Sequence, residues 1–148
     1  MSEISVVVDT SDFDRWIRNV QRRHPSFYNL LLREAGLLAA QKIREKAPEK
    51  TGVLKKSVTA QIRGDTVIAG PTVPYAPYVE FGTRPHEILP VRVQALRFSV
   101  DGETIFAKRV WHPGFPGHYF IRDSQDEVIK ELRTLAENFY TQLYGGTS

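Results

Sequence analysis

The chain has 148 residues, of which 20 are Lys or Arg and 17 are Asp or Glu, so its formal net charge is +3, and it contains no cysteine. A chain of this length buries enough surface to hold a core unaided, and we expect residues 1–148 to form a single domain. The lack of cysteine excludes a disulfide scaffold, thiol catalysis, iron–sulfur clusters and cysteine-based zinc sites, and a surplus of three charges does not by itself indicate nucleic-acid binding.

The first residues predict a short strand followed by a helix. Ile4 to Val8 is a β-branched run, and Ser11 with Asp14 resembles a capping box. The helix is expected to end at His24-Pro25, because the residue before a proline disfavours helical geometry. Glu3 stands where a signal peptide carries a base, and no stretch approaches the ~18 consecutive apolar residues of a membrane span, so neither export by that route nor a membrane span is expected.

A long helix follows and is the clearest element of the sequence. Ser26 is expected to cap it, and its apolar face runs from Tyr28 to Ile43. The helix is expected to end at Ala47-Pro48. Cations in its last turns suit the negative pole of the helix dipole and need no ligand to explain them; they are Lys42, Arg44 and Lys46.

Two hairpins and a closing helix are expected next. Val53 to Arg63 and Thr66 to Ala69 flank a Gly-Asp turn, and their apolar residues alternate with polar ones. Ala95 to Val100 and Glu103 to Val110 flank an Asp-Gly turn in the same way. A capping box from Ser124 to Glu127 predicts the start of the last helix, and a Gly-Gly pair ends it.

Two segments combine aromatic residues with turn formers. Residues 70–90 include five prolines, so regular structure is not expected there, and residues 111–120 are also rich in rings, proline and glycine. Long connections are usually functional or disordered, yet disorder disfavours aromatic residues. Rigid rings on proline-stiffened loops lose little entropy on docking and suit protein–protein contacts. The alternative is that the rings fold back as satellite core. Both can hold at once, with Tyr78 and Phe81 anchored inward and Tyr75 and Ile88 facing a neighbour.

Catalytic and metal-binding interpretations have weaker support. His112 and His118 are six residues apart, which fits neither a helical metal pair nor a zinc finger. Glu80 could act as a general base with His86 or His112. The simpler interpretation is that it accepts backbone N–H groups of the glycine turn that follows it, or pairs with Arg84. No nucleophile elbow or phosphate-binding glycine loop is present. We therefore expect no catalytic residue, no metal and no cofactor.

Three motifs stand out in their order along the chain. They are Ala47 to Ser57 after the long helix, with Thr-Gly-x-Leu inside it, Tyr75 to Thr83 with the string Val-Glu-Phe-Gly-Thr, and His112-Pro-Gly114 leading to Phe120 and a closing helix. Together they resemble the tail-completion family of long-tailed bacteriophages, small neck proteins of the head–tail connector. The resemblance spans roughly residues 25–140. Family members often have Pro-Phe-Leu-x-Pro-Ala before the last helix, where this chain has His118 to Ser124.

The resemblance implies an α+β fold, in which a β-sheet is packed by a long helix and a C-terminal helix. Together with the elements expected from the residues, this predicts an antiparallel β-sheet, a long central helix and a C-terminal helix, preceded by a short N-terminal strand and helix. It implies a structural virion protein of the neck, assembled in the host cytoplasm, that forms a ring at the head–tail junction and completes or joins the tail without catalysis. The implied partners are further copies of the chain, adjacent connector or adaptor proteins, tail-tube or tail-terminator proteins, and genomic DNA passing without sequence recognition. No membrane partner is implied.

Two sets of residues are candidates for these contacts. Those expected at the subunit or partner interface are Tyr75, Tyr78, Glu80, Phe81, Arg84, Ile88, Trp111 and Phe115. Contacts in a cyclic ring are heterologous, so that one face of each subunit meets a different face of the next. Candidates for lining a DNA channel, through weak and salt-sensitive contacts, are Lys50, Lys55 and Lys56.

The main alternative is a sequence-independent nucleic-acid-binding module. It would use the same three lysines, with Tyr75, Tyr78 and Phe115 as stacking platforms. Against it, Arg84 is the only Lys or Arg between Gly70 and Pro90.

Overall fold

The fold mixes helices with small antiparallel sheets, and this confirms the α+β prediction. The computed structural model describes residues 14–145. The predicted strand from Ile4 to Val8 and the Ser11 cap lie outside them. The elements are α1 (Asp14–Arg23), α2 (Pro25–Lys46), α3 (Val53–Ser57), β1 (Val58–Arg63), β2 (Thr66–Pro71), α4 (Ala76–Phe81), β3 (Gly82–Thr83), β4 (His86–Ile88), β5 (Leu96–Val100), β6 (Glu103–Ala107), β7 (Val110–His112), β8 (Phe115–Pro116) and α5 (Phe120–Tyr144).

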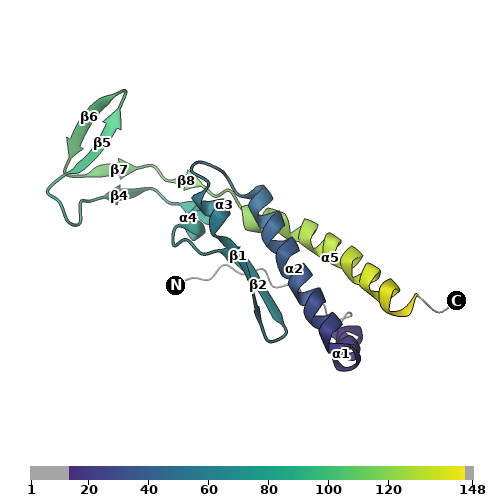
Figure 1. Ribbon diagram of the computed structural model, residues 1–148. Coiled ribbons are helices and arrows are strands. Elements are labelled where there is room, and N and C mark those ends of the chain that lie inside the picture. Colours follow the sequence, from purple (N-terminus) through teal and green to yellow (C-terminus); the bar gives the residue numbers. More distant parts are fainter. Residues whose placement is uncertain (1–13, 146–148) are drawn as a thin grey trace.

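The molecule consists of a helical body and a long β arm (Figure 1). We call residues 82–118 the arm and the other described residues the body. In the body, α2 and α5 run side by side, the β1–β2 hairpin lies along α2, and α1 sits at the N-terminal end of α2. α3 and α4 lie at the opposite end of α2, and the arm projects from there away from the helices.

The strands form four separate two-stranded sheets instead of the single sheet expected from the sequence. β1 pairs with β2, β3 with β8, β4 with β7 and β5 with β6, all antiparallel. The first pair lies on α2, and β3 contacts α4 at the base of the arm. The other three pairs form the arm.

The hydrophobic core lies where the C-terminal half of α2 meets the start of α5. Arg44 Nη2 donates to the Val58 carbonyl at 2.6 Å and joins α2 to β1. Gly36 lets the hairpin approach α2 closely, because a side chain at that position would press on Val67. The buried residues of this core come from segments before and after the arm. They are Ala40, Ile43, Ala47, Leu54, Val58, Ala69, Ala76, Phe120 and Ile121.

Ion pairs and aromatic contacts hold α2 against α5 along the rest of their length. Lys42 Nζ lies 2.7 Å from a carboxylate oxygen of Glu131, and Lys46 Nζ lies 2.6 Å from Glu127. The hydrogen bond from Lys46 lowers the pKa of the Glu127 carboxyl below its usual value. Further along, the rings of Phe27 and Phe139 meet edge to face, with their centroids 4.7 Å apart.

The first two helices confirm the sequence prediction, but the predicted cap of the second is wrong. α1 ends at Arg23 and α2 begins at Pro25, whose missing N–H is tolerated in the first turn of a helix. His24 occupies the N-cap position and Ser26 already lies inside α2, so Ser26 does not cap it. α2 ends at Lys46, as predicted.

Two segments predicted to lack helix contain short helices. Val53 to Ser57 was expected to begin a strand but forms α3, because one helical turn places Leu54 in the core and lets Ser57 Oγ donate to the Leu54 carbonyl at 2.7 Å. The segment from residue 70 to 90 was expected to be irregular. It holds α4, where Pro77 sits in the first turn, and then β3 and β4.

The last helix begins five residues earlier than the capping box predicted, because its N-cap is Tyr119 and not Ser124. α5 starts at Phe120, and both Phe120 and Ile121 are buried in the core. Ser124 lies within the helix, is fully buried, and donates to the Ile121 carbonyl at 2.7 Å. Its hydroxyl therefore does not cap the helix.

Candidate functional site

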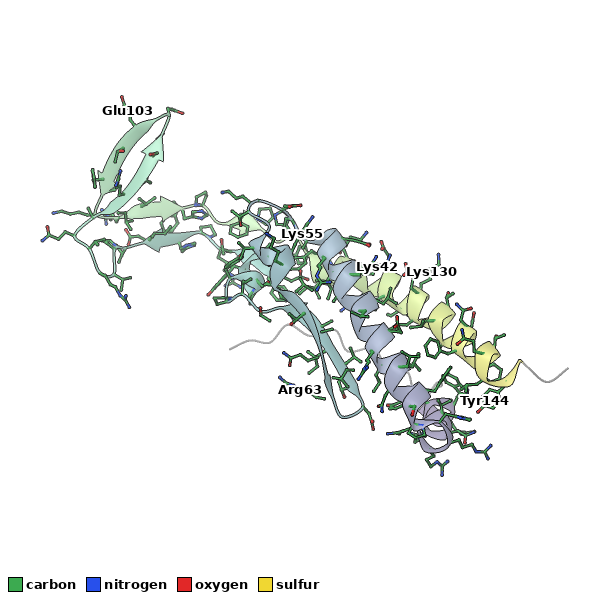
Figure 2. All side chains as sticks on the ribbon, viewed as in Figure 1. Lys42, Lys55, Arg63, Glu103, Lys130 and Tyr144 are labelled. Atoms are coloured by element: carbon green, nitrogen blue, oxygen red, sulfur yellow. The ribbon has the colours of Figure 1, made fainter. Side chains whose placement is uncertain are left out.

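The arm is a two-stranded ribbon built in three steps. β3 pairs with β8 next to the body, β4 pairs with β7 further out, and the β5–β6 hairpin forms the end, with Glu103 at its tip (Figure 2). The hairpin has the predicted turn, and Leu96 faces Ala107 across the strands. Val110, expected in the hairpin, belongs to β7 instead, where it faces Ile88.

Close backbone contacts fix the arm where it leaves the body. Gly82 and Gly114 both have positive φ angles, of 77° and 79°. A Cβ atom at Gly82 would collide with the Phe115 carbonyl, and one at Gly114 would collide with the Thr83 carbonyl. The returning strand is joined to α4 by a hydrogen bond from the His118 amide to the Val79 carbonyl, at 2.9 Å. Glycine is therefore required on both legs of the arm at its base.

The outer part of the arm exposes many large apolar side chains. Val91 is 92% exposed, and Phe106 and Trp111 are about two-thirds exposed, at 66% and 67%. The other exposed apolar residues of this region are Leu89, Val93, Val100 and Ile105. A ribbon of only two strands cannot cover either of its faces, and such ribbons are marginally stable in water without further packing. Many exposed large apolar side chains on one short segment indicate an interaction site.

A groove lies at the base of the arm, and we call it the root groove. One wall is the segment from Pro48 to Leu54, and the other is formed by Tyr75, Val79, Phe115 and His118. Its volume is about 570 Å³ and most of its lining is apolar. Val53, Tyr75 and Phe115 are between 39% and 49% exposed, so the groove is open to a partner.

Most of the predicted interface residues lie at the surface around the groove and along the arm. Tyr78, Phe81 and Arg84 are exposed, as are Tyr75, Trp111 and Phe115, and Ile88 is half-buried in β4. The expectation that Tyr78 and Phe81 anchor inward is wrong, because they are 59% and 61% exposed. The buried face of α4 carries Ala76 and Glu80 instead.

Glu80 is buried and differs from the other predicted interface residues in this respect. Only 2% of it is exposed, and its carboxylate accepts the backbone N–H groups of Ile121 at 2.9 Å and Arg122 at 3.0 Å. Its backbone carbonyl also accepts the Tyr119 amide, at 3.0 Å. The sequence interpretation of Glu80 as an acceptor of backbone N–H groups is correct, but the groups belong to α5. Glu80 therefore holds the subunit together and is not available to a partner.

Two of the histidines meet on the arm. His86 and His112 face each other across β4 and β7, and their rings stack with centroids 5.2 Å apart. The Gly114 amide donates to Nδ1 of His112 at 3.0 Å, and Nδ1 of His86 lies 2.8 Å from the Arg84 carbonyl. Both Nδ1 atoms thus stabilise the local backbone. Among residues 14–145, no three metal-binding side chains come together.

The three candidate channel lysines lie around α3, at the arm end of the body. Lys55 Nζ pairs with Glu49 at 2.9 Å, and this hydrogen bond lowers the pKa of the Glu49 carboxyl. Lys50 and Lys56 are exposed. Lys55 lies at the opposite end of the body from Arg63 (Figure 2).

Sequence reasoning did not name the exposed apolar residues that lie between the two predicted segments, which are Val91, Val93, Val100, Ile105 and Phe106. Their signal was the number of large apolar side chains in and beside the predicted hairpin. Within residues 14–145, β5 and β6 pair only with each other, and the hairpin projects away from the helices (Figure 1).

None of the helices in the described part of the chain could span a membrane.

Residues 13–82, just under half of the chain, match the HK97-gp10-like family, described as "Bacteriophage HK97-gp10, putative tail-component". This match confirms the resemblance to a phage tail-component family over that segment. The description of that family names a component of the phage tail. Neither a curated protein nor a solved structure matches the chain significantly.

Proposed function

We propose that the chain is a structural protein of the phage neck, which forms a ring at the head–tail junction and completes or joins the tail without catalysing a reaction. Its partners in this proposal are further copies of itself, the adjacent connector or adaptor protein, and the tail-tube or tail-terminator protein. Genomic DNA would pass through the ring without sequence recognition. The match of residues 13–82 to a tail-component family supports the setting.

The arm is the observation that carries the proposal. Its outer part projects away from the described helices (Figure 1), and it exposes Val91, Phe106 and Trp111. Apolar surface in water is unfavourable by roughly 25 cal/mol per Å², so a ribbon of this composition gains stability when another surface covers it. Interfaces are built around aromatic and apolar residues of this kind.

A ring with heterologous contacts needs two different complementary faces on each subunit, and the chain has two apolar surfaces that could serve. One is the outer arm and the other is the root groove, whose apolar wall includes Val53. The arm leads away from α3 and α4 (Figure 1), which carry lining residues of the root groove, so the groove is open to the arm of another copy. Contact of an arm with the groove of the next subunit is heterologous and propagates around a ring.

The first test is the mass of the protein in solution as its concentration rises, with imaging of any assembly. The wild type is expected to form closed rings, and the variant Phe106→Ser with Trp111→Ser is expected to stay monomeric. The matched control is Leu37→Ser on α2, which removes a side chain of similar exposure, 62%, from the body and is expected to leave assembly intact. Rings formed by the arm variant would exclude the arm contact, and a wild type that stays monomeric at every concentration would exclude self-assembly.

A second test locates the contact by cross-linking, which is straightforward because the chain has no cysteine. One variant carries Phe106→Cys on the arm and the other carries Val53→Cys in the root groove. Under mild oxidation, an equal mixture is expected to yield a covalent dimer that neither variant yields alone. If Phe106→Cys alone gives the dimer, the arms meet each other and the heterologous contact is wrong.

A further inference from the structure

The positive charge of the chain is concentrated in one helix. α1 contains four arginines, Arg15, Arg18, Arg22 and Arg23, and one acid, Asp14, which sum to +3. The whole chain has 20 bases and 17 acids, so the other 138 residues hold 16 of each and are neutral overall. The ten residues of α1 therefore account for the entire net charge.

Three of the arginines form one stripe on the outer side of α1. Arg15, Arg18 and Arg22 follow the i, i+3, i+7 spacing of a single helix face, and Arg23 lies at the edge of this face. All four are exposed, whereas Val20, on the opposite face, is fully buried. From Arg15 to Arg22 the stripe extends about 10 Å, at ~1.5 Å per residue. Packing of the apolar face thus directs the charges away from the body.

Helix α1, which carries the stripe, lies at the end of the body that is remote from the arm (Figure 1). There α1 contacts the turn of the β1–β2 hairpin, where Gln21 Nε2 donates to Asp65 at 3.0 Å. Arg63, beside this turn, adds a further base at the same end (Figure 2). The apolar surface and the basic surface are therefore separate, and one subunit can use both at the same time.

The composition of the stripe favours a nucleic acid over a protein as its partner. Arginine is also common in protein interfaces, but the cores of those interfaces contain few charges, whereas the exposed face of α1 carries like charges at close spacing. Interfaces with DNA are polar and strongly positive, and a guanidinium matches the geometry of a phosphate. We propose that the arginine stripe of α1 contacts the phosphate backbone of duplex DNA and does not read its bases. This inference rests on the proposed function in one respect, namely that the subunit meets genomic DNA. It assigns the main DNA contact to the stripe on α1 and not to Lys50, Lys55 and Lys56.

The test is a fluorescence-anisotropy titration of two 30-base-pair duplexes of unrelated sequence, repeated over a range of KCl concentrations. The variant Arg15→Glu with Arg22→Glu and Arg23→Glu is compared with Lys50→Glu, Lys55→Glu and Lys56→Glu, which changes the net charge by the same six units. A third variant with Gln at the three arginine positions avoids introducing repulsion. Circular dichroism and the urea midpoint verify that each variant folds.

The wild type is expected to bind both duplexes equally, with an affinity that falls linearly on a log–log plot against salt. Three phosphate contacts give a log–log slope of about −2.7. Over the tenfold range from 1 M to 0.1 M salt, these contacts therefore raise the affinity by about 500-fold, and their loss removes that gain. The two arginine variants are expected to lose at least 100-fold at 0.1 M salt, and the lysine variant less than about threefold.

Three results would overturn the inference. They are a wild type that binds neither duplex at low salt, a lysine variant that loses binding while the arginine variants keep it, and arginine variants that stop assembling but still bind DNA. The last would assign the stripe to a protein contact. Rings without DNA binding would contradict this inference alone, whereas DNA binding through α1 without rings would contradict the proposed function alone.

Discussion

Replacing Glu80 tests how the two halves of the subunit are joined. Its carboxylate accepts the first N–H groups of α5, from Ile121 and Arg122, at 2.9 and 3.0 Å. N–H groups in the first turn of a helix have no partner within the helix, and a negative charge there also interacts favourably with the helix dipole. Because Glu80 is 2% exposed, water cannot readily replace it.

The magnitude follows from the two bonds. A hydrogen bond to a charged group contributes about 1.5–3 kcal/mol. Glu80→Ala removes two such bonds, but the Arg122 amide is only partly buried and regains water, so we expect the free energy of unfolding to fall by about 3–4 kcal/mol. Glu80→Gln keeps one acceptor oxygen and turns an NH₂ group toward the other donor, and we expect a loss of about 2 kcal/mol. For a chain of this size, 3 kcal/mol lowers Tm by roughly 6–12 °C.

The assay is urea unfolding at pH 7, followed by circular dichroism, with hydrogen exchange at the amides of Ile121 and Arg122. The control is Glu87→Ala on the arm, because Glu87 is exposed and its pairing with Arg109 is loose, at 3.6 Å. A change within about 0.5 kcal/mol is expected for that control. If Glu80→Ala unfolds at the wild-type urea concentration, or if the two amides keep their protection, the buried carboxylate does not hold α5 and the reasoning fails.

Three further predictions concern the arm base, the helix seam and the start of α5. Gly82→Ala is expected to disrupt the arm base, because its Cβ would collide with the backbone of the returning strand. The control Gly102→Ala has a positive φ but open space around it, so its free energy of unfolding in urea should fall by only about 1 kcal/mol. Equal losses of unfolding free energy in the two variants would contradict this. The hydrogen bond from Lys46 lowers the pKa of Glu127 in the folded protein below its ordinary value of 4.5. The stability that this pair contributes is therefore complete above pH 4.5 and is lost as the pH falls through the pKa of the folded protein. Glu127→Gln should therefore weaken the decline of the urea midpoint in acid, and an unchanged decline would exclude this pair as a cause. Ser124→Ala should change stability by less than about 1 kcal/mol, since its hydroxyl is not a cap; a larger loss would support the capping box after all.

The helices with local signals were predictable. α2 was correct over nearly its whole length because its apolar spacing, its proline boundaries and its terminal cations all lie within the segment itself. The β5–β6 hairpin was also predictable, since its Asp-Gly turn adopts positive φ angles at Asp101 and Gly102. Sequence periodicity carries this information without reference to the rest of the chain.

The features that sequence reasoning missed depend on distant residues. The start of α5 is set by Glu80, 41 residues before Ile121, so the nearby capping box was misleading. The pairing of β4 with β7 joins segments separated by the whole hairpin, and no local pattern indicates it. The basic stripe of α1 was visible in the sequence, but a count of net charge over the full chain concealed it. Charge counted element by element would have found it.

The boundary of the family match has a physical implication for how the subunit folds. The matched segment ends at residue 82, where the arm begins, so α1, α2, α3, α4 and the β1–β2 hairpin lie inside it and α5 lies outside. Yet Phe120 and Ile121 of α5 are buried in the same core as Ile43 of α2. Removing α5 would expose that core and leave the Glu80 carboxylate without the two donors that compensate its burial. The matched segment therefore needs α5 to form its core. The arm is inserted between Glu80 and the helix that Glu80 caps. A longer or shorter arm would leave that core undisturbed as long as its two legs meet at Gly82 and Gly114.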